Sequence, residues 1–294
     1  MSSPASLTAE RCAIVLDSTS DLPDCRERYA NMRMVPLTVR FGDEELLDYE
    51  EISPQRFYER LAGDPLPPRT AAPPPERFGE CYRRLLGDDG YEHVLSLHLS
   101  EALSATVASA RLAAAEFDGR VTVVDTRTVS IGLALASLGI ARQLAAGPCS
   151  LAQLVAEGEG FHRRSQLVFA FETLEFLQRN GRIGRGKALV GGLLGVRPLL
   201  TLVDGEVEPL GRVRGHARLL SELERLVCED TRPDERLRVG IAHAQAEGIA
   251  NDIAERVRSV RPQAEIELVA PLGAVVGTNT GPGGAGLVWA REPG

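Results

Sequence analysis

The sequence is poor in the features that mark disulfide-bonded, zinc-binding and membrane-spanning proteins. Its five cysteines, at positions 12, 25, 81, 149 and 228, are odd in number and form no Cys-x-x-Cys pair. This pattern predicts a reducing, cytoplasmic environment with neither a disulfide framework nor a zinc site. The N-terminus has no charged segment followed by an apolar run, and the longest apolar stretches are too short or too glycine-rich to cross a bilayer. We therefore expect no stable membrane insertion and leave transient membrane contact open.

The chain also lacks an excess of basic residues. Its formal net charge is −8, from 33 lysines and arginines against 41 aspartates and glutamates. A general nucleic-acid binder would carry a basic face, so no nucleic-acid partner is expected. With 294 residues, of which 44% are hydrophobic, the chain is long enough for a large core and for two domains.

The common catalytic signatures are missing as well. There is no G-x-x-x-x-G-K-[ST] loop, no G-x-S-x-G elbow and no H-E-x-x-H pair. Asp17 follows an apolar run as the nucleophile of a haloacid-dehalogenase-type phosphatase would, but that chemistry needs a second carboxylate where Thr19 stands. His98 lies inside a strand pattern and is interpreted as a packed core residue rather than a base.

What the first half does contain is an alternation of strands and helices. A proline-rich stretch at 66–75 is expected to be a stiff connector that cannot form a central strand. The alternation predicts an α/β fold with a mostly parallel sheet covered on both faces. Strands are predicted at 12–16, 34–41, 94–99 and 120–125, and helices at 21–28, 54–61, 76–86, after the 100–106 turn, and at 131–146.

The second half is predicted to form another α/β unit. The Asp204-Gly205 pair between two apolar runs predicts a β-hairpin. The boundary is placed near residues 147–150, which gives domains at 1–148 and 149–294. Strands are expected at 167–171, 197–203, 206–214, 237–243 and 264–269, and helices at 151–163, 173–179, 188–194, 216–229 and 247–261.

Small hydroxyl residues follow several of the predicted strands. Asp17 and Ser18 follow the first strand, and Ser100, Ser104 and Thr106 follow the strand at 94–99. Free amides at a helix start, with Ser100 or Ser104 as cap, form a site for an anion such as a carboxylate. The plainer interpretation is that these serines only cap the helix.

Two further segments have no obvious structural role. Residues 180–187 place Arg182, Arg185 and Lys187 on a glycine-rich loop, which is either a solvated loop or a contact surface for an anion or a partner protein. Residues 277–286 (GTNTGPGGAG) carry more glycines than a turn needs. A close approach of their backbone to a ligand would explain the glycines, with polar groups supplied by Thr278, Asn279 and Thr280.

Taken in order, these segments resemble one protein family. AIVLDSTSDLP at 13–23, VPLTVRF at 35–41, LSEALSATVASA at 99–110, the 123–132 segment, NGRIGRGKALVGGLLGVRPLLTLVDGEVEPLGRVRG at 180–215 and GTNTGPGGAGL at 277–287 resemble the DegV proteins. This bacterial family binds fatty acids and includes the kinase-associated FakB proteins. The resemblance runs from about Ala13 to Trp289.

The resemblance implies a two-domain α/β protein that holds one long-chain fatty acid, such as palmitate or oleate, in a buried tunnel, with no other cofactor and no metal. It assigns the carboxylate to the hydroxyls of Thr70 and Ser104, with Asn279 completing the polar network. It implies that the protein is not an enzyme but presents the acid to a separate fatty acid kinase, with Arg182 on the surface that faces the kinase.

The chain departs from the family pattern at three of its polar positions. Ala71 replaces a hydroxyl residue, Ala105 a glycine and Asn279 a histidine, so one head-group partner cannot carry charge near neutral pH. The alternative hypothesis is a small-molecule enzyme, an acyl or phosphate hydrolase or transferase, that uses Asp17 and the strand-end hydroxyls.

Overall fold

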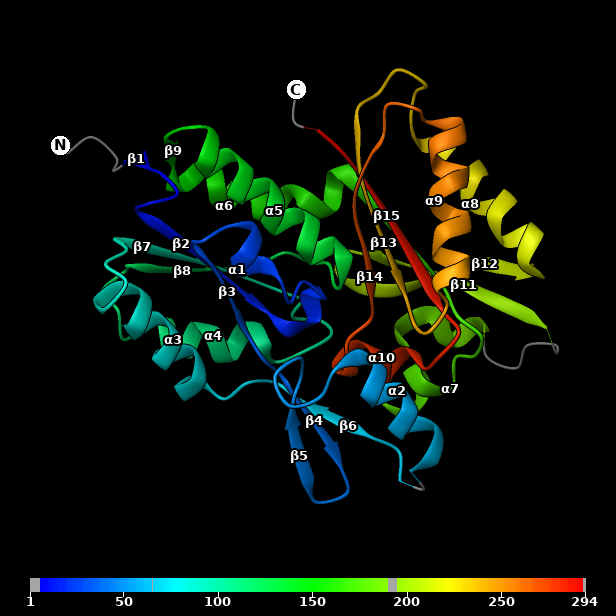
Figure 1. Cartoon of the computed structure of the whole chain (residues 1–294), viewed down its shortest axis with the longest axis horizontal. Coiled ribbons are helices and arrows are strands. Elements are labelled where there is room, and N and C mark those ends of the chain that lie inside the picture. Colours follow the sequence, from blue (N-terminus) through cyan, green and yellow to red (C-terminus); the bar gives the residue numbers. More distant parts are fainter. Residues whose placement is uncertain (1–5, 65, 190–194, 293–294) are drawn as a thin grey trace.

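The computed structural model describes residues 6–64, 66–189 and 195–292. Its first sheet, in the order β3-β2-β7-β8, is wholly parallel, which confirms the parallel sheet predicted for this half. Helices α3 and α4 pack against one face and helices α5 and α6 against the other (Figure 1). The strands are β2 (Cys12–Asp17), β3 (Met32–Val35), β7 (His93–His98) and β8 (Val121–Asp125), and the helices are α1 (Cys25–Arg28), α3 (Pro75–Gly87), α4 (Thr106–Ala114), α5 (Ile131–Ala146) and α6 (Leu151–Arg164).

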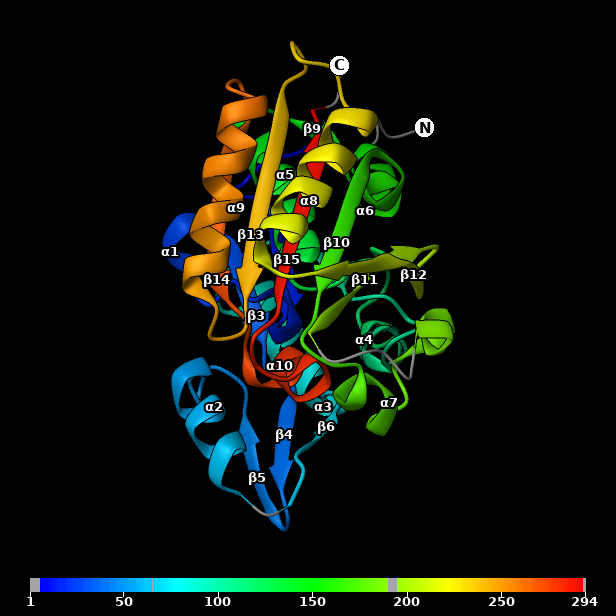
Figure 2. The ribbon, with the colours of Figure 1, turned by 90° about the vertical axis from the view of Figure 1, so that its right-hand side faces the viewer.

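A six-stranded sheet forms the second large layer, in the order β12-β11-β10-β15-β13-β14. Only the β13–β14 pair is parallel; the other four pairs are antiparallel. Figure 2 shows α8 and α9 running alongside its long strands β13 and β15. Its elements are β10 (Ser165–Ala170), β11 (Val196–Val203), β12 (Glu206–Arg214), α8 (His216–Asp230), β13 (Leu237–His243), α9 (Glu247–Val260), β14 (Glu265–Pro271) and β15 (Ala285–Arg291).

Helices α5 and α6 lie between the two large sheets. α5 contacts β2 and β7 on one side and β13 and β14 on the other. Its sequence, IGLALASLGIARQLAA, is apolar around most of its circumference, because a helix covered by sheets on two sides has little surface left for water. The largest hydrophobic cluster accordingly includes side chains from Leu7 to Ala290. The division into domains at 148 and 149 stays a prediction.

A small antiparallel sheet at one end of the molecule corrects two expectations (Figures 1 and 2). The predicted strand at 34–41 is broken at Pro36, which has no N–H for a ladder, and its second part joins this other sheet. The proline-rich stretch contains an edge strand rather than only a connector. The elements are β4 (Thr38–Phe41), β5 (Glu44–Leu47), α2 (Pro54–Gly63) and β6 (Arg69–Ala71).

Short elements complete the described chain. Of the helix predicted at 188–194, residues 190–194 lie outside the described residues, and the part before them ends a 3-10 turn. The remaining elements are β1 (Ser6–Leu7), which pairs with β9 (Cys149–Ser150), the 3-10 turns η1 (Ser18–Ser20) and η2 (Gly184–Leu189), and the helices α7 (Glu175–Arg179) and α10 (Ala274–Thr280).

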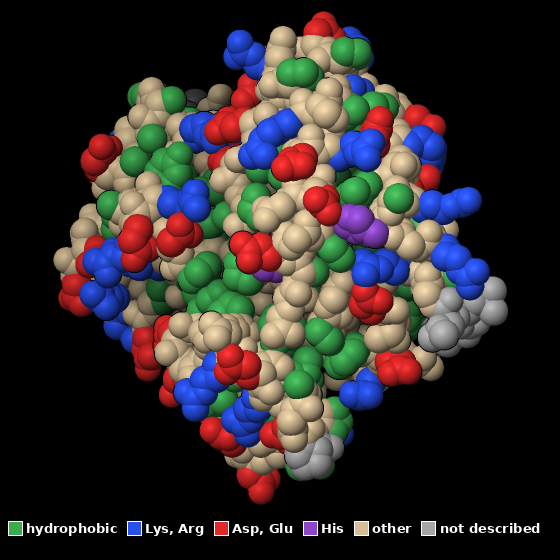
Figure 3. Space-filling model, turned by 45° about the vertical axis from the view of Figure 1, so that its right-hand side comes forward, with side chains coloured by type: hydrophobic (Ala, Val, Ile, Leu, Met, Phe, Trp, Pro, Cys, Tyr) green, Lys and Arg blue, Asp and Glu red, His purple; other side chains and the backbone are tan. Residues whose placement is uncertain are grey.

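Charge is evenly distributed on the surface that Figure 3 shows. Acidic and basic side chains are interspersed over this face rather than separated into blocks of one sign. Such a face offers no extended field of one sign to attract a charged polymer.

Candidate functional site

A pocket opens where the first sheet, the small sheet and the six-stranded sheet approach one another. It encloses about 900 Å³ of space not filled by protein atoms, including space open to solvent, which is within the size range of small-molecule sites. Its polar lining residues are Thr19, Thr70, Ser104, Arg182, Asn279 and Thr280. Its apolar lining residues are Leu37, Ala71, Ala72, Leu99, Leu103, Ala105, Val129, Phe169, Phe171, Leu177, Leu200, Leu202, Val207, Val275 and Val276.

The carboxyl ends of β2 and β7 supply one wall of this pocket. In a parallel sheet these ends meet at one edge, and here Asp17 at the end of β2 contacts His98 at the end of β7, with Asp17 Oδ2 3.0 Å from His98 Nδ1. The chain then turns through η1, which places Thr19 in the lining. The turn after β2 and the 100–106 turn after β7 therefore both reach the pocket, through Thr19 and Ser104.

Ser104 lines the pocket without capping the helix that follows. The N-cap of α4 is Ala105, and it makes no side-chain cap bond, so the expectation that Ser100 or Ser104 is the cap is wrong. Ser104 Oγ instead accepts the Thr106 N–H at 3.3 Å and lies 2.8 Å from Thr106 Oγ1. Thr106 itself is buried and is not among the lining residues.

Thr70 reaches the pocket from the edge strand β6. Backbone pairing of Thr70 with Val39 of β4 fixes its position. Among the described residues its hydroxyl has no hydrogen-bond partner, so both its donor and its acceptor capacity are available. The sequence places Thr70 and Ser104 more than thirty residues apart, and the fold brings both to one pocket.

The third predicted head-group residue, Asn279, lies on α10 together with Thr280. Asn279 Nδ2 donates to Val275 O at 2.9 Å, and Thr280 Oγ1 donates to Val276 O at 3.1 Å. Asn279 Oδ1 is buried and has no partner within the described residues. Helix α10 packs against β6 and η1, so Asn279 shares a wall with Thr70 and Thr19.

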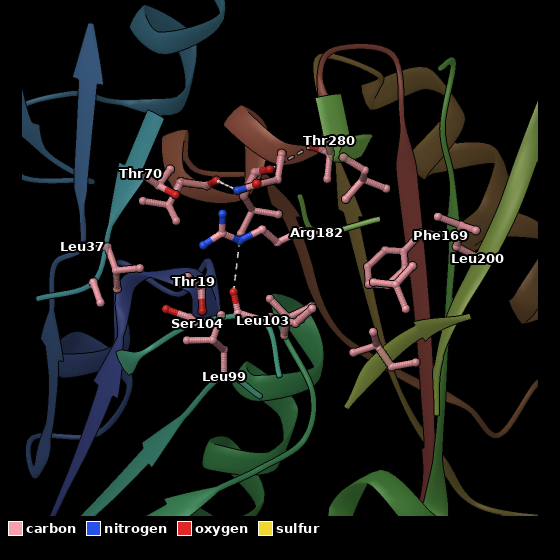
Figure 4. Close-up of a pocket in the computed structure, with 18 of the residues that line it drawn as sticks. Thr19, Leu37, Thr70, Leu99, Leu103, Ser104, Phe169, Arg182, Leu200 and Thr280 are labelled. Atoms are coloured by element: carbon pink, nitrogen blue, oxygen red, sulfur yellow. Dashed lines mark hydrogen bonds between the residues drawn. The ribbon is translucent and has the colours of Figure 1, made fainter. Parts of the chain in front are cut away.

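Arg182 is both exposed and part of the lining. Its Nε donates to Leu103 O at 3.3 Å and its Nη1 to Asn180 O at 2.6 Å. In Figure 4 its guanidinium lies with Thr19, Thr70 and Ser104 toward one part of the pocket, and Phe169 lies toward the other. Arg185 and Lys187 are exposed outside the lining, and Arg185 pairs with Glu208 at 2.8 Å.

Besides Thr106, three of the supporting residues predicted from sequence do not line the pocket. Asp17 is fully buried behind it, Ser18 Oγ accepts the Leu37 N–H, and Thr278 Oγ1 donates to Ala274 O. The residue that sequence reasoning missed is Thr19. Its signal in the sequence is its place in the strand-end run Asp17-Ser18-Thr19, which puts a third polar side chain at the end of β2.

The glycines of the 277–286 segment serve packing rather than the pocket. A Cβ on Gly277 would lie 2.7 Å from the Phe57 ring, and one on Gly281, at φ +70, would lie 2.3 Å from the Phe176 ring. No glycine of 277–286 is among the lining residues. The expectation that these glycines approach a ligand is therefore wrong, since they approach side chains of α2 and of the α7 helix.

A chain of buried hydrogen bonds leads from Thr19 into the core. Thr19 Oγ1 is 2.5 Å from Asp17 Oδ1, Asp17 Oδ2 contacts His98, and His98 Nε2 is 2.7 Å from Ser96 Oγ. Ser96 Oγ is in turn 2.7 Å from Tyr82 Oη. His98 is fully buried and contacts the Phe78 ring edge-on, in keeping with its interpretation as a core residue.

A second buried group holds the helix that carries Asn279. Asp21 accepts from Tyr49 Oη, Ser130 Oγ and the Gly273 N–H, and Asp48 accepts from the Ala274 N–H. Burial raises the pKa of Asp21 to about 7. Burial, and then the charge of Asp21, raises the pKa of Asp48 to about 8.

The described residues include no cluster of three or more histidine, cysteine or acidic side chains arranged to hold a metal ion. Among the helices of the described ranges, none combines the length and apolar character needed to cross a membrane.

Comparison with known proteins points to one family. Residues 11–292 match the family described as "Uncharacterised protein, DegV family". A DegV domain-containing protein of Deinococcus radiodurans is 44% identical over 211 residues, which cover 72% of this chain and 74% of that protein. Another, from Streptomyces coelicolor, is 36% identical over 276 residues, or 94% of this chain and 97% of that protein.

Solved structures match over nearly the whole chain. A DegV family protein of Thermus thermophilus, described by its fatty acid binding, is 39% identical with a TM-score of 0.89 and covers 96% of this chain and 100% of its own. DegV of Bacillus subtilis, described as a fatty acid binding protein, is 29% identical with a TM-score of 0.84 and covers 96% and 99%.

Proposed function

The chain belongs to the DegV family, and from this premise we propose that it binds one long-chain fatty acid in the pocket lined by Thr70, Ser104 and Phe169. The observation that carries the proposal is the form of the lining, in which a group of hydroxyl and amide side chains adjoins a wall of leucine, valine and phenylalanine. A fatty acid has the same division into a polar head and an apolar tail. The Thermus thermophilus and Bacillus subtilis relatives, both described as binding fatty acids, support it.

The energetics favour a ligand of this kind. Burial of a methylene group contributes about 0.8 kcal/mol, so a tail of about 14 methylenes contributes roughly 11 kcal/mol before ordering costs. One neutral hydrogen bond contributes only about 1 kcal/mol. Replacement of the family histidine by Asn279 therefore leaves most of the binding energy in place.

We assign the head group to the hydroxyls of Thr70 and Ser104, with Asn279 on the adjoining wall. The Thr70 hydroxyl has no competing hydrogen bond within the described residues. The Ser104 hydroxyl contacts one other side chain there, that of Thr106. Thr280 lines the same wall as Asn279, and we assign it a supporting role at the head group. Asp17, Ser18, Thr106 and Thr278 act behind the lining.

The protein is proposed to be a lipid-binding subunit rather than an enzyme, located in the cytoplasm, where it presents the acid to a separate fatty acid kinase that forms the acyl phosphate. Arg182, next to the pocket and exposed, is the candidate contact for that kinase, with Arg185 and Lys187 on the same loop. No cofactor besides the fatty acid is required, and transient membrane contact would serve to load it.

The test is native mass spectrometry of the purified full-length chain. We expect a co-purified long-chain acid, displaced by added palmitate or oleate in a ratio of one per chain. A clean apo mass together with no uptake of either acid would contradict the proposal.

The alternative of an enzyme that uses Asp17 gains no support from the geometry. Both Asp17 oxygens already accept two hydrogen bonds each, and the side chain is fully buried outside the pocket. A carboxylate so engaged is not positioned to attack a ligand. Turnover of an acyl-phosphate or ester that disappears in Asp17→Asn would favour the enzyme.

A further inference from the structure

Thr19 presents an acceptor, and no donor, to the pocket. It is 1% exposed, lines the pocket, and its Oγ1 lies 2.5 Å from Asp17 Oδ1. Where the hydroxyl proton points toward Asp17, only the lone pairs of Oγ1 remain for a ligand. The protonation of Asp17 decides which of the two oxygens holds that proton.

Two backbone amides donate to Asp17, one to each carboxylate oxygen. Its Oδ1 accepts the Thr19 N–H at 3.0 Å, and its Oδ2 accepts the Leu99 N–H at 3.1 Å. Both are backbone amides, which can only donate, and His98 Nδ1 at 3.0 Å is the fourth contact. A backbone N–H donated to each oxygen suits an ionised carboxylate, which accepts only. The Thr19 hydroxyl therefore donates to Asp17.

On the α10 wall, Thr280 has used its donor within the protein, whereas Asn279 has used one of its two N–H groups. Thr280 Oγ1 donates to Val276 O, and Asn279 Nδ2 donates to Val275 O. Asn279 cannot be turned around, since its Oδ1 would then face another carbonyl oxygen. Free donors are left on Thr70 and on the Ser104–Thr106 pair, which has two hydroxyl protons and one bond between them. Asn279 keeps one N–H, and the exposed Arg182 guanidinium keeps N–H groups beyond the two that bond to Leu103 O and Asn180 O.

We propose that Thr19 is a head-group residue that accepts the acidic proton of the ligand, so that the pocket takes the fatty acid as the neutral carboxylic acid. This inference rests on the proposed function. An ionised carboxylate accepts only and would leave Thr19 opposed by a second acceptor, whereas a neutral carboxyl brings one O–H donor and one carbonyl acceptor. Thr19 accepts the O–H, and Thr70 and Ser104 donate to the carbonyl oxygen.

Arg182 acts in the opposite direction, because a positive charge favours the ionised acid. Its side chain is exposed, and its Nε and Nη1 already donate to Leu103 O and Asn180 O. Water screens a charge in that position, whereas Thr19 and Asp17 are buried. The buried pair therefore determines the form of the acid that is bound.

The experiment compares dodecanoic acid with dodecan-1-ol on the delipidated full-length chain. The alcohol keeps the O–H donor and does not ionise. We expect both to bind, with the affinity for the acid falling about tenfold per pH unit from pH 6 to pH 8 relative to the alcohol, because the free acid must regain a proton. Any titration of a protein group changes the affinities for the acid and for the alcohol by the same factor, so it cancels in the ratio of the two affinities. Calorimetry in two buffers of different ionisation enthalpy should show one proton taken up per acid at pH 7.5 and none per alcohol.

Variants assign the effect to Thr19. Thr19→Val should weaken alcohol binding about fivefold and flatten the pH dependence for the acid, whereas Thr19→Ser, which keeps the hydroxyl, should retain both. Thr278→Val is the control, since Thr278 is a buried threonine of α10 whose hydroxyl donates to a backbone carbonyl, Ala274 O, and which lies outside the lining.

The possible results distinguish a failure of the neutral-acid inference from a failure of the proposed fatty-acid binding. If the acid binds with the same affinity at all pH values while the alcohol does not bind, fatty-acid binding stands and the neutral-acid inference is overturned. If neither ligand binds, the proposed function fails and the inference with it.

Discussion

Asp21 and Asp48 accept hydrogen bonds from two consecutive backbone amides at the start of α10, Gly273 N–H at 2.8 Å and Ala274 N–H at 2.9 Å. The two carboxyls come from different segments, Asp21 directly after η1 and Asp48 directly after β5, and both are buried. They fix the helix whose later residues Asn279 and Thr280 line the pocket. Asp48 Oδ2 has no partner within the described residues, which suits a carboxyl that keeps its proton.

This pair predicts a loss of stability with rising pH. The folded pKa values, about 7 for Asp21 and about 8 for Asp48, lie above the ordinary aspartate value of about 4. The folded state therefore binds more protons than the unfolded state between these limits. Its extra stability is fully present below about pH 4 and is lost as the pH rises through 7 and 8. Urea unfolding at pH 5 to 8 should therefore show an unfolding free energy with a contribution from this pair that falls as the pH rises.

Asp48→Asn isolates the effect. The amide keeps an acceptor for the Ala274 N–H but cannot ionise, so the decline in unfolding free energy with pH should be shallower than in the unchanged chain. The buried His93 and the partly buried His243, whose pKa values desolvation lowers, act in the opposite sense, but they are common to both proteins and cancel. Exposed Asp43→Asn is the control, and equal slopes in all three proteins would contradict the prediction.

Ser104→Ala tests the assigned head-group contact. Removal of one neutral hydrogen bond of about 1 kcal/mol should weaken palmitate binding about fivefold, with little change in fold. Ser137→Ala serves as a control, because Ser137 is a buried helical serine that donates to Leu133 O far from the lining. Equal affinities for palmitate in the two variants would remove Ser104 from the head-group site.

How far the sequence predicts this molecule depends on whether a feature is local. The Asp204-Gly205 turn, with φ of 49° and 85°, forms the predicted hairpin, and Ser150 forms a full capping box with Gln153, because these signals act within a few residues. The break at Pro36 depends on which sheet each part joins, and the local pattern does not contain that choice.

The site divides in the same way. Hydroxyls at strand ends are visible in the sequence, and the parallel order of the sheet brings them together. The role of Thr19 depends on four contacts to Asp17, two of them from the β7 strand end some eighty residues away. The glycines of 277–286 likewise depend on Phe57 and Phe176, which no spacing within that segment indicates.

Gly281→Ala tests this packing account. The residue has φ of +70°, and an added Cβ would lie 2.3 Å from the Phe176 ring, so both the backbone and the aromatic side chain resist the change. We expect a loss of about 2–4 kcal/mol in unfolding free energy. Gly248→Ala, on an exposed position of α9 with nothing within 4 Å, should instead be neutral or slightly stabilising.

Arg182→Ala separates kinase docking from ligand binding. Arg182 is exposed at the pocket and contacts Leu103 O, one residue before Ser104, so it is placed to sense the head group and to meet a partner. If its charge steers docking, acyl-phosphate formation by the kinase should slow about tenfold, and more at low ionic strength, while the Kd for palmitate changes by less than about threefold. Arg185→Ala is the control, since that side chain is already paired with Glu208. A large loss of palmitate affinity in Arg182→Ala would instead make Arg182 a ligand contact and reject the docking role.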